Sequence, residues 1–443
     1  MFPKNIFSKS VLLNLTIMLI PASYIAGNLI LNLNILILIF LVFLFFGLEV
    51  FSNKLTKIDL LIVMLFGYIL INGIINNFFN FEFSSVPDEN IILKKSFLYL
   101  RFLILYFVIK FLIVKELLNY KLLFLAFGAC SLFVSFDILI QYFFGKDIFG
   151  FKGDGRRLSG PFGDEYIAGS FIQRFYIFLP FFLLLFVKIK KESLSNLLFL
   201  SILLVSILGA LFSGNRVPLI LVILSLVMIF FFQKSLRRIL LIIFIIFSSS
   251  FFYLIKNNEG FSNHYNSFVM RSYQIADYFK SKATSSEIKT ANIYIKELES
   301  GIFTWEKNKL FGGGIKSFYW HCSAIDRDKM LLFVTKRGAV NCNSHPHNYY
   351  LQIASELGIF GLFLFIFTFF YILISALRVI RLRENLFLEK KMLIPFLILF
   401  FVEIFPIKTT GNFFTTTNST YLFIILTFVV GLLEFKNNKK YYE

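Results

Sequence analysis

Charged residues are scarce in this sequence, and acidic residues are the scarcer kind. Asp, Glu, Lys and Arg make up 16% of the chain, against about 25% in an average soluble protein. With 44 basic and 26 acidic residues, the formal net charge is +18. The basic residues sit in short groups between apolar runs, as in membrane proteins, and form no single basic domain. We therefore expect no nucleic-acid partner.

Motifs that mark many soluble enzymes are also missing. The sequence has no P-loop, no GxSxG elbow and no paired-His zinc motif on a helix. It contains four His and three Cys. His345 and His347 are spaced to share a metal on a strand, but no cluster of Cys, His or carboxylates completes a usual site. We expect neither a metal nor another cofactor.

Apolar residues dominate, and they occur in long runs. They make up 58% of the chain, and Phe alone occurs 63 times. Runs of about 18 or more apolar residues read as membrane-spanning helices, whereas barrel strands alternate. We predict an all-α polytopic membrane protein with about 12 transmembrane helices, at residues 11–29, 32–52, 59–79, 95–114, 118–143, 166–187, 194–212, 217–233, 236–255, 349–376, 392–408 and 419–434.

Basic residues fall in every second loop between these predicted spans. Such loops face the cytoplasm in membrane proteins. The basic loops and tails contain Lys4, Lys9, Lys54, Lys57, Lys115, Lys121, Lys188, Lys190, Lys191, Lys234, Arg237, Arg238, Arg378, Arg381, Arg383, Lys390, Lys391, Lys436, Lys439 and Lys440. Both termini are therefore expected in the cytoplasm, with the first apolar run retained as a helix.

One long loop, residues 256–348, is expected on the opposite face between the ninth and tenth spans. It divides the chain into spans one to nine (1–255), the loop, and a closing part (349–443). Apolar residues at helical spacing predict short helices within 268–308, packed on the membrane face. Cys322 and Cys342 both fall in this loop, where a disulfide is plausible outside the cytoplasm. Cys130 lies in an apolar run and is expected to be buried.

The sharpest motif ends this loop and reads Ser344-His345-Pro346-His347-Asn348. A near-neutral imidazole at the lipid–water boundary could accept a proton from a sugar hydroxyl. Asn348 could orient that imidazole. The alternative is a proline-containing helix start with interfacial anchors, which are common at that depth. The residues alone leave both interpretations open.

Basic residues at the other outer turns are the remaining candidates. Arg216, in the turn Ser213–Pro218, could grip a phosphate through two parallel hydrogen bonds, although it could also snorkel to lipid phosphates. Arg157 lies in a Gly-rich loop before the sixth span. Arg174, about two turns into that span, needs an acidic partner or a water-filled cavity. Glu403 is a membrane carboxylate that could pair with Lys408 or Arg174.

Three segments, in this order, resemble the O-antigen ligase and O-antigen polymerase family of bacterial envelope glycosyltransferases. The turn Ser213–Arg216 is similar to the family's Ser/Thr-x-Ser-Arg turn. Residues 308–318, NKLFGGGIKSF, resemble its Asn-Pro-hydrophobic-hydrophobic-Gly-x-Gly segment. The third is His-Pro-His-Asn at 345–348, followed by Glu-x-Gly-x-x-Gly at 356–361. The resemblance covers roughly residues 150–430.

This resemblance implies a reaction and its participants. The family takes a glycan from an undecaprenyl-diphosphate carrier at the outer face of the bacterial inner membrane. It passes the glycan to an acceptor sugar, on a lipid A core or another repeat unit, with inversion and without a metal. The donor, the acceptor and membrane lipids are thus the expected partners. The implied base is His347, and the implied diphosphate ligand is Arg216.

Two departures from the family pattern affect the expected second basic contact. Asn308 is followed by Lys309 where Pro is usual, and the position near Tyr294, often His in polymerases, is not His here. Arg271 is the first candidate for the second contact and Lys296 the next. Arg157, Arg174, His345 and Asn348 complete the expected substrate-binding residues.

Two other functions compete with this one. Ionisable groups in or near spans, among them Asp137, Arg174 and Glu403, would suit a transporter or a flippase for lipid-linked oligosaccharides. The spans lack paired Gly/Pro-broken helices in matching halves, which argues against that class. An envelope assembly protein that binds partners through the loop is the third possibility. The sequence does not separate a ligase from a polymerase.

Overall fold

The computed structural model describes residues 9–79, 90–154, 156–281, 292–323, 342–381, 388–408 and 411–434. Within these residues the fold is helical, and the only β-type pairing is one isolated bridge between Lys146 and Lys152. The bundle helices are α1 (Lys9–Met18), α2 (Ile20–Ile25), α3 (Asn28–Phe46), α4 (Lys57–Phe79), α5 (Ile91–Tyr99), α6 (Arg101–Val114), α7 (Tyr120–Phe144), α8 (Ala168–Phe175), α9 (Phe178–Phe186), α10 (Glu192–Phe212), α11 (Arg216–Phe232), α12 (Arg237–Asn257), α17 (Tyr349–Arg381), α18 (Leu388–Glu403) and α19 (Thr416–Glu434).

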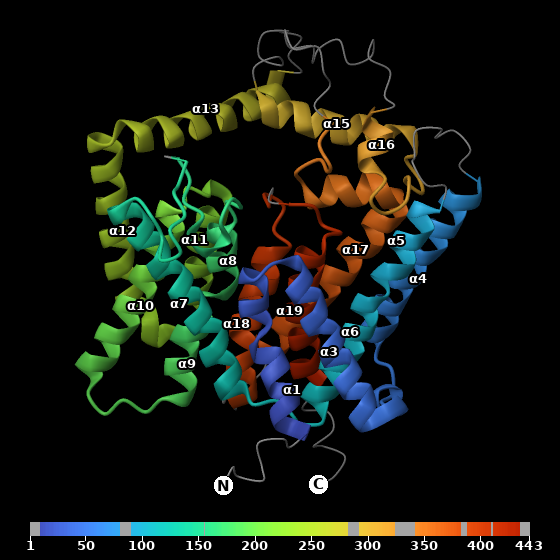
Figure 1. Cartoon of the computed structure of the whole chain (residues 1–443), viewed down its shortest axis with the longest axis horizontal. Helices are drawn as coiled ribbons and strands as arrows, with labels where there is room; N and C mark the ends of the chain where they lie inside the picture. Colours follow the sequence, from blue (N-terminus) through green and yellow to red (C-terminus); the bar gives the residue numbers. More distant parts are fainter. Residues whose placement is uncertain are drawn as a thin grey trace.

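Three further helices lie in the predicted long loop: α13 (Glu259–Ser281), α15 (Ile293–Lys307) and α16 (Phe318–Ser323). Figure 1 shows α13 and α15 running across one end of the bundle, roughly at right angles to the helices below them. We call this the outer end. The sequence predicts only short helices here, but α13 has 23 residues. It starts at Glu259, with only Asn258 between it and the end of α12, so no loop separates the two helices.

Nine helical segments in the described part of the chain are long and apolar enough to cross a membrane. The predicted count of about 12 is not confirmed. The first predicted span, 11–29, is broken between α1 and α2, where Pro21 cannot continue the hydrogen-bond ladder. The eighth corresponds to α11, with 17 residues, and the eleventh to α18, with 16. The eleventh ends early at Glu403, three residues before Pro406.

The centre of the bundle is formed by α19, which is buried from Ser419 to Leu432. It packs against α6 and α18, and aromatic side chains fill the spaces between these helices and α7. Phe396 of α18 stacks on Phe428 at 4.5 Å and meets Phe124 of α7 edge-on at 5.6 Å. Lipid tails are as apolar as these side chains, so close packing and ring geometry hold the helices together.

The start of α1 and the end of α19 lie at the same end of the bundle, opposite α13 and α15 (Figure 1). Asn14 of α1 donates to the carbonyl of Leu117, after α6, and Glu434 of α19 pairs with Lys110 near the end of α6. A chain that crosses a bundle an even number of times starts and finishes on the same side of it. Which side faces the cytoplasm stays a prediction.

A break in α17 joins two of the sequence motifs. Gly358 has φ +69°, and a side chain there would collide with the carbonyl of Leu310. At this break the backbone pairs with the glycine-rich segment: Gly314 N–H donates to Glu356 O, and Ile359 N–H donates to Lys309 O. The glycine run therefore lets two backbones approach each other, and it holds the start of α17 against the outer-end helices.

Candidate functional site

A cavity of about 570 Å³ opens at the outer end. Its walls come from the loop before α8, the starts of α8 and α11, from α13 and α15, and from the loop before α17. Its polar lining residues are Arg157, Tyr166, Ser170, Asn215, Arg216, Arg271, Tyr294, Glu297, His345 and His347. The fold thus gathers five of the predicted site residues into one space: Arg157, Arg216, Arg271, His345 and His347.

Contacts of Gly214 and Asn215 hold the Ser213–Arg216 turn in place. Gly214 has φ +69°, and a Cβ there would lie 2.3 Å from the carbonyl oxygen of Arg156. Asn215 bridges to the start of α8: its Nδ2 donates to Tyr166 O at 3.1 Å, and its Oδ1 accepts from Gly169 N at 3.0 Å. Consequently Arg216 begins α11 close to the loop that carries Arg157.

Arg216 rests against His264 of α13. Its Nη2 lies 2.8 Å from His264 Nδ1, and His264 Nε2 lies 3.0 Å from Gly214 O. If Nε2–H donates to that carbonyl, Nδ1 is left to accept from the guanidinium. Burial lowers the pKa of His264. The hydrogen bond to Gly214 raises it, but the nearby charges of Arg216, Arg157 and Arg156 lower it further. A neutral His264 therefore holds the arginine without neutralising its charge.

Positive charge is concentrated on this side of the cavity. Arg271 of α13 lies with its guanidinium 5.9 Å from the centre of the Tyr294 ring, and Arg216 lies 5.5 Å from the Phe268 ring. Among the described residues, no carboxylate forms an ion pair with Arg157, Arg216 or Arg271. Three such guanidinium groups around one space favour an anionic ligand with several oxygens.

The histidine side of the cavity carries a carboxylate. His347 Nε2 lies 3.5 Å from Glu297 Oε1, and Asn343 Nδ2 donates to the same oxygen at 3.2 Å. Burial raises the pKa of Glu297, although the charge of His347 and the hydrogen bond from Asn343 lower it in part. His347 has φ +50°, a conformation that is uncommon for a residue other than glycine and often marks a functional position.

His345 lies beside His347, with ring centres 4.2 Å apart. Burial lowers the pKa of His345 to about 4, and the neighbouring His347 and Lys316 act in the same direction. His345 therefore stays neutral near pH 7. Ser344 Oγ is 2.9 Å from its Nδ1. The two histidines thus differ in their partners: in the described part of the chain, His347 lies against a carboxylate and His345 does not.

Asn348 sits at the start of α17. Its Oδ1 accepts from the backbone N–H groups of Tyr350 and Leu351, and its Nδ2 donates to Pro406 O at 3.0 Å. This is the helix-capping geometry that asparagine favours. The side chain does not line the cavity. It positions the histidine loop through the backbone, while its predicted contact with substrate stays a prediction.

Arg174 and Lys296 are also absent from the cavity lining. Arg174 is buried and pairs with Glu403, Nη2 to Oε1 at 2.8 Å, and its Nη2 also donates to Asn418. Lys408 contacts the other oxygen of Glu403. Glu403, for which the sequence offers two basic partners, contacts both of them. This buried network gives Arg174 the acidic partner that a charge in the membrane needs, while its predicted contact with substrate stays a prediction.

Two residues that contact the predicted site residues, Glu297 in the cavity lining and His264 behind Arg216, were not predicted from the sequence. Glu297 and His264 lie in helices whose apolar pattern gives only their helical state, and each meets its partner across about 50 positions of chain. Cys322 and Cys342, by contrast, form a disulfide with a Cα–Cα distance of 5.6 Å. No group of three or more metal-ligating side chains occurs within the part of the chain described here.

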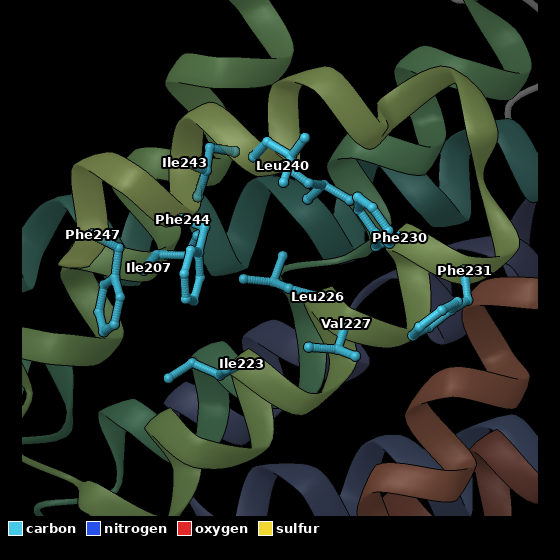
Figure 2. Close-up of a pocket in the computed structure, with 11 residues that line it drawn as sticks. Ile207, Ile223, Leu226, Val227, Phe230, Phe231, Leu240, Ile243, Phe244 and Phe247 are labelled. Carbon is cyan, nitrogen blue, oxygen red and sulfur yellow. The ribbon is translucent and has the colours of Figure 1, made fainter.

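A second large cavity, of about 250 Å³, is purely apolar. Figure 2 shows its lining of aliphatic and aromatic side chains from α10, α11 and α12, among them Ile207, Leu226 and Phe244. It offers no group for acid–base work or for binding a phosphate. It can hold hydrocarbon, and α11, which begins at Arg216, forms one of its walls.

Fold and site together define a multi-pass helical membrane protein with an arginine- and histidine-lined cavity at one end. Residues 201–366 match the family model described as O-antigen ligase. The match confirms the predicted resemblance to the O-antigen ligase and O-antigen polymerase family. The matched region is similar to a family of membrane enzymes of the O-antigen ligase and polymerase type. No curated protein sequence matches the chain.

The matched region coincides with most of the cavity. It runs from within α10 to within α17 and includes Arg216, Arg271, Glu297 and both histidines. Arg157 and the start of α8 lie before it in the sequence. One wall of the cavity, formed by Arg157 and the start of α8, therefore comes from outside the matched region.

Proposed function

We propose that the protein transfers a glycan from an undecaprenyl-diphosphate carrier to an acceptor sugar, with inversion and without a metal. One observation carries this proposal. Three arginines that lack carboxylate ion pairs among the described residues face a histidine–carboxylate pair across one cavity of about 570 Å³. A diphosphate leaving group and a hydroxyl nucleophile need these two kinds of group, one on each side of the reacting carbon.

The diphosphate is assigned to the arginine side. Arg216 would hold it at the membrane boundary, with Arg271 and Arg157 as further contacts. Negative charge builds on the diphosphate as its bond to the sugar breaks, so guanidinium groups fixed beforehand lower the barrier. The apolar cavity along α11 supports a lipid-linked donor, because hydrocarbon can lie beside the helix that presents Arg216.

His347 is assigned as the base. The acceptor hydroxyl oxygen attacks the anomeric carbon from the face opposite the diphosphate, and the carbon–oxygen bond to the diphosphate breaks with its electron pair. The hydroxyl proton passes to His347. Glu297, 3.5 Å from Nε2, would orient the ring and stabilise the imidazolium that forms. His345, neutral near pH 7, is assigned to substrate binding.

The predicted topology belongs to the same proposal. Residues 1–255 and 349–443 would form the membrane part, and residues 256–348 the periplasmic loop. Both termini would lie in the cytoplasm of a bacterium, and the reaction would take place at the outer face of its inner membrane. Lys296, a half-exposed residue of α15 that does not line the cavity, stays a reserve candidate for an anion contact.

Complementation of a deletion strain tests the proposal. His347→Gln and Arg216→Gln variants that insert normally should each lose the surface glycan ladder. Arg156→Gln is the matched control, because Arg156 is exposed beside Arg157 but does not line the cavity. A wild-type ladder from both cavity variants would contradict the proposal. In the deletion strain, single repeats on the core would identify a polymerase. A bare core with carrier-linked chains would identify a ligase.

A further inference from the structure

A separate cavity of about 220 Å³ lies among α5, α6, the segment between α15 and α16, and the start of α19. Three basic side chains line it: Lys95, Arg101 and Lys316. Tyr99 and Thr416 are its other polar residues. None of these five residues lines the arginine–histidine cavity.

The positive charge of this small cavity is not neutralised within it. No carboxylate lines it, and within the described residues none of its three basic side chains forms an ion pair. Arg101 Nη2 donates to Thr416 Oγ1 at 3.0 Å, while Arg101 Nε is buried without a hydrogen-bond partner. A buried guanidinium N–H without an acceptor is costly, so it indicates a place for a ligand oxygen.

Glu356 is an acidic residue close to Lys316, but both of its carboxylate oxygens already accept hydrogen bonds. Its Oε2 accepts from the backbone N–H of Lys316 at 2.6 Å, and its Oε1 accepts from Gln352 Nε2 at 3.0 Å. Burial lowers the pKa of Lys316; Glu356 opposes this, but Lys95 and Arg101 add to it. The three cations therefore repel one another, and an anion between them would relieve that repulsion.

The backbone of Lys316 is held in an uncommon conformation. Its φ is +67°, which a lysine rarely adopts, and the bond from its N–H to Glu356 fixes it there. The adjacent Ser317 N–H donates to Gly314 O at 3.3 Å. Strain of this kind persists where the surrounding structure determines it, and it is concentrated at ligand-binding positions.

The surroundings of the cavity are apolar and exposed. Phe97 and Leu98 of α5 are 66% and 57% exposed, as expected for side chains that face lipid. In Figure 1, α5 and α16 lie on the opposite side of the bundle from α11, with the start of α17 between them. The charge of Lys316 lowers the pKa of His345, so the cavity is close enough to the histidine loop for their charges to interact.

We propose that Lys95, Arg101 and Lys316 form a binding site for a phosphate or carboxylate group on a membrane-anchored molecule. If the proposed transfer reaction is correct, on which this assignment rests, that molecule is the acceptor. The histidine loop would then lie between an acceptor anion on one side and the donor diphosphate on the other. Arg101 would supply paired N–H donors, and the two lysines would supply mobile charges around them.

Binding to the purified full-length protein in phosphatidylcholine nanodiscs tests the site. The probes are diphosphorylated lipid A and phosphatidylglycerol. Wild type should bind at least one of them about tenfold more tightly than Lys95→Gln/Lys316→Gln, because each lost ammonium removes a charge-assisted hydrogen bond to the anion. Lys309→Gln is the matched control: Lys309 is exposed in the same outer segment and lines neither cavity. Arg101 is left unchanged, since it is partly buried.

The two probes distinguish the source of the anion. Stronger binding of lipid A than of phosphatidylglycerol supports the acceptor. Equal binding of both, lost in the double variant, supports a site for bulk anionic lipid and overturns the acceptor assignment. Equal affinities in wild type and the double variant overturn the site itself. His347→Gln separates the two proposals: it should bind lipid A normally while losing transfer, and retained transfer would remove the proposed reaction but not the site.

Discussion

His347 and Glu297 face each other across the outer cavity, with Nε2 3.5 Å from Oε1, although one lies before α17 and the other in α15. The side chain of Glu297 is 11% exposed and that of His347 33%. The carboxylate is thus largely buried, while the ring remains open to the cavity. A carboxylate behind an imidazole is the arrangement that orients a general base and stabilises its protonated form.

Glu297→Gln should lower kcat on the order of 10²-fold, because the imidazolium loses its counter-charge while substrate contacts remain. KM should change little. Burial raises the pKa of Glu297, so this group contributes to the acid limb of the wild-type pH–rate profile, and that limb should move in the variant. Steady-state transfer assays across pH measure both effects.

Glu306→Gln is the control for this change, since Glu306 lies exposed on the same helix and does not line the cavity. If Glu297→Gln lowered the amount of folded protein but left kcat and the pH profile of the remainder unchanged, the residue would be structural only.

Arg271→Lys tests the second cationic contact. Lysine keeps the charge but loses the paired N–H geometry and the position over Tyr294. Transfer should fall by roughly tenfold or more, with less effect from Arg271→Lys than from Arg271→Gln. Comparing kcat/KM for the lipid-linked donor measures this. Equal activity of Arg271→Gln and wild type would remove Arg271 from the donor site and leave Lys296 as the candidate.

Arg174→Gln is expected to damage folding rather than catalysis. It leaves Lys408 as the only basic partner of the buried Glu403 among the described residues and removes the bond to Asn418. Breaking a buried ion pair costs about 3–5 kcal/mol, so the thermal midpoint in detergent should fall clearly. Glu403→Gln should lower the midpoint further, because it leaves both Arg174 and Lys408 buried without a counter-charge.

A transporter would behave differently at this position. Arg174→Gln would then insert and unfold like wild type but lose function, while His347→Gln would retain it. That pair of results would favour the lipid-linked oligosaccharide transporter over the glycosyltransferase.

Acid should destabilise the outer-end helices through His321. Burial lowers the pKa of His321 to about 4, and Lys307 acts in the same direction. Between about pH 6.5 and 4 the unfolded chain therefore binds more protons than the folded one, so the free energy of unfolding falls as the pH falls. Thermal melts over this range should show the trend, and His321→Gln should flatten it. His345 has the same sign and would retain part of the slope. An unchanged slope in His321→Gln/His345→Gln would contradict this account.

Much of this architecture could be read from the sequence. Apolar runs predict helices because each residue carries its own cost of exposure to water, and most of the bundle helices begin and end close to the predicted bounds. The prediction failed where the length of a run misleads: residues 11–29 are apolar enough, but Pro21 divides them into two helices. The motifs with Arg216 and His347 were also visible, because each lies in a polar segment directly before a predicted span.

The sequence by itself determined the helical membrane class, the resemblance to the O-antigen ligase family and the two residues at the centre of its proposed chemistry. Only the tertiary structure decided that Arg216 and His347 line one cavity, that Glu297 and His264 support them, and that Arg174 belongs to a buried ion-pair network. The reason is physical. The transfer of an apolar residue into lipid depends on that residue and its near neighbours. An ion pair or a hydrogen bond depends on the distance between side chains that may be far apart in the chain, and packing alone sets that distance.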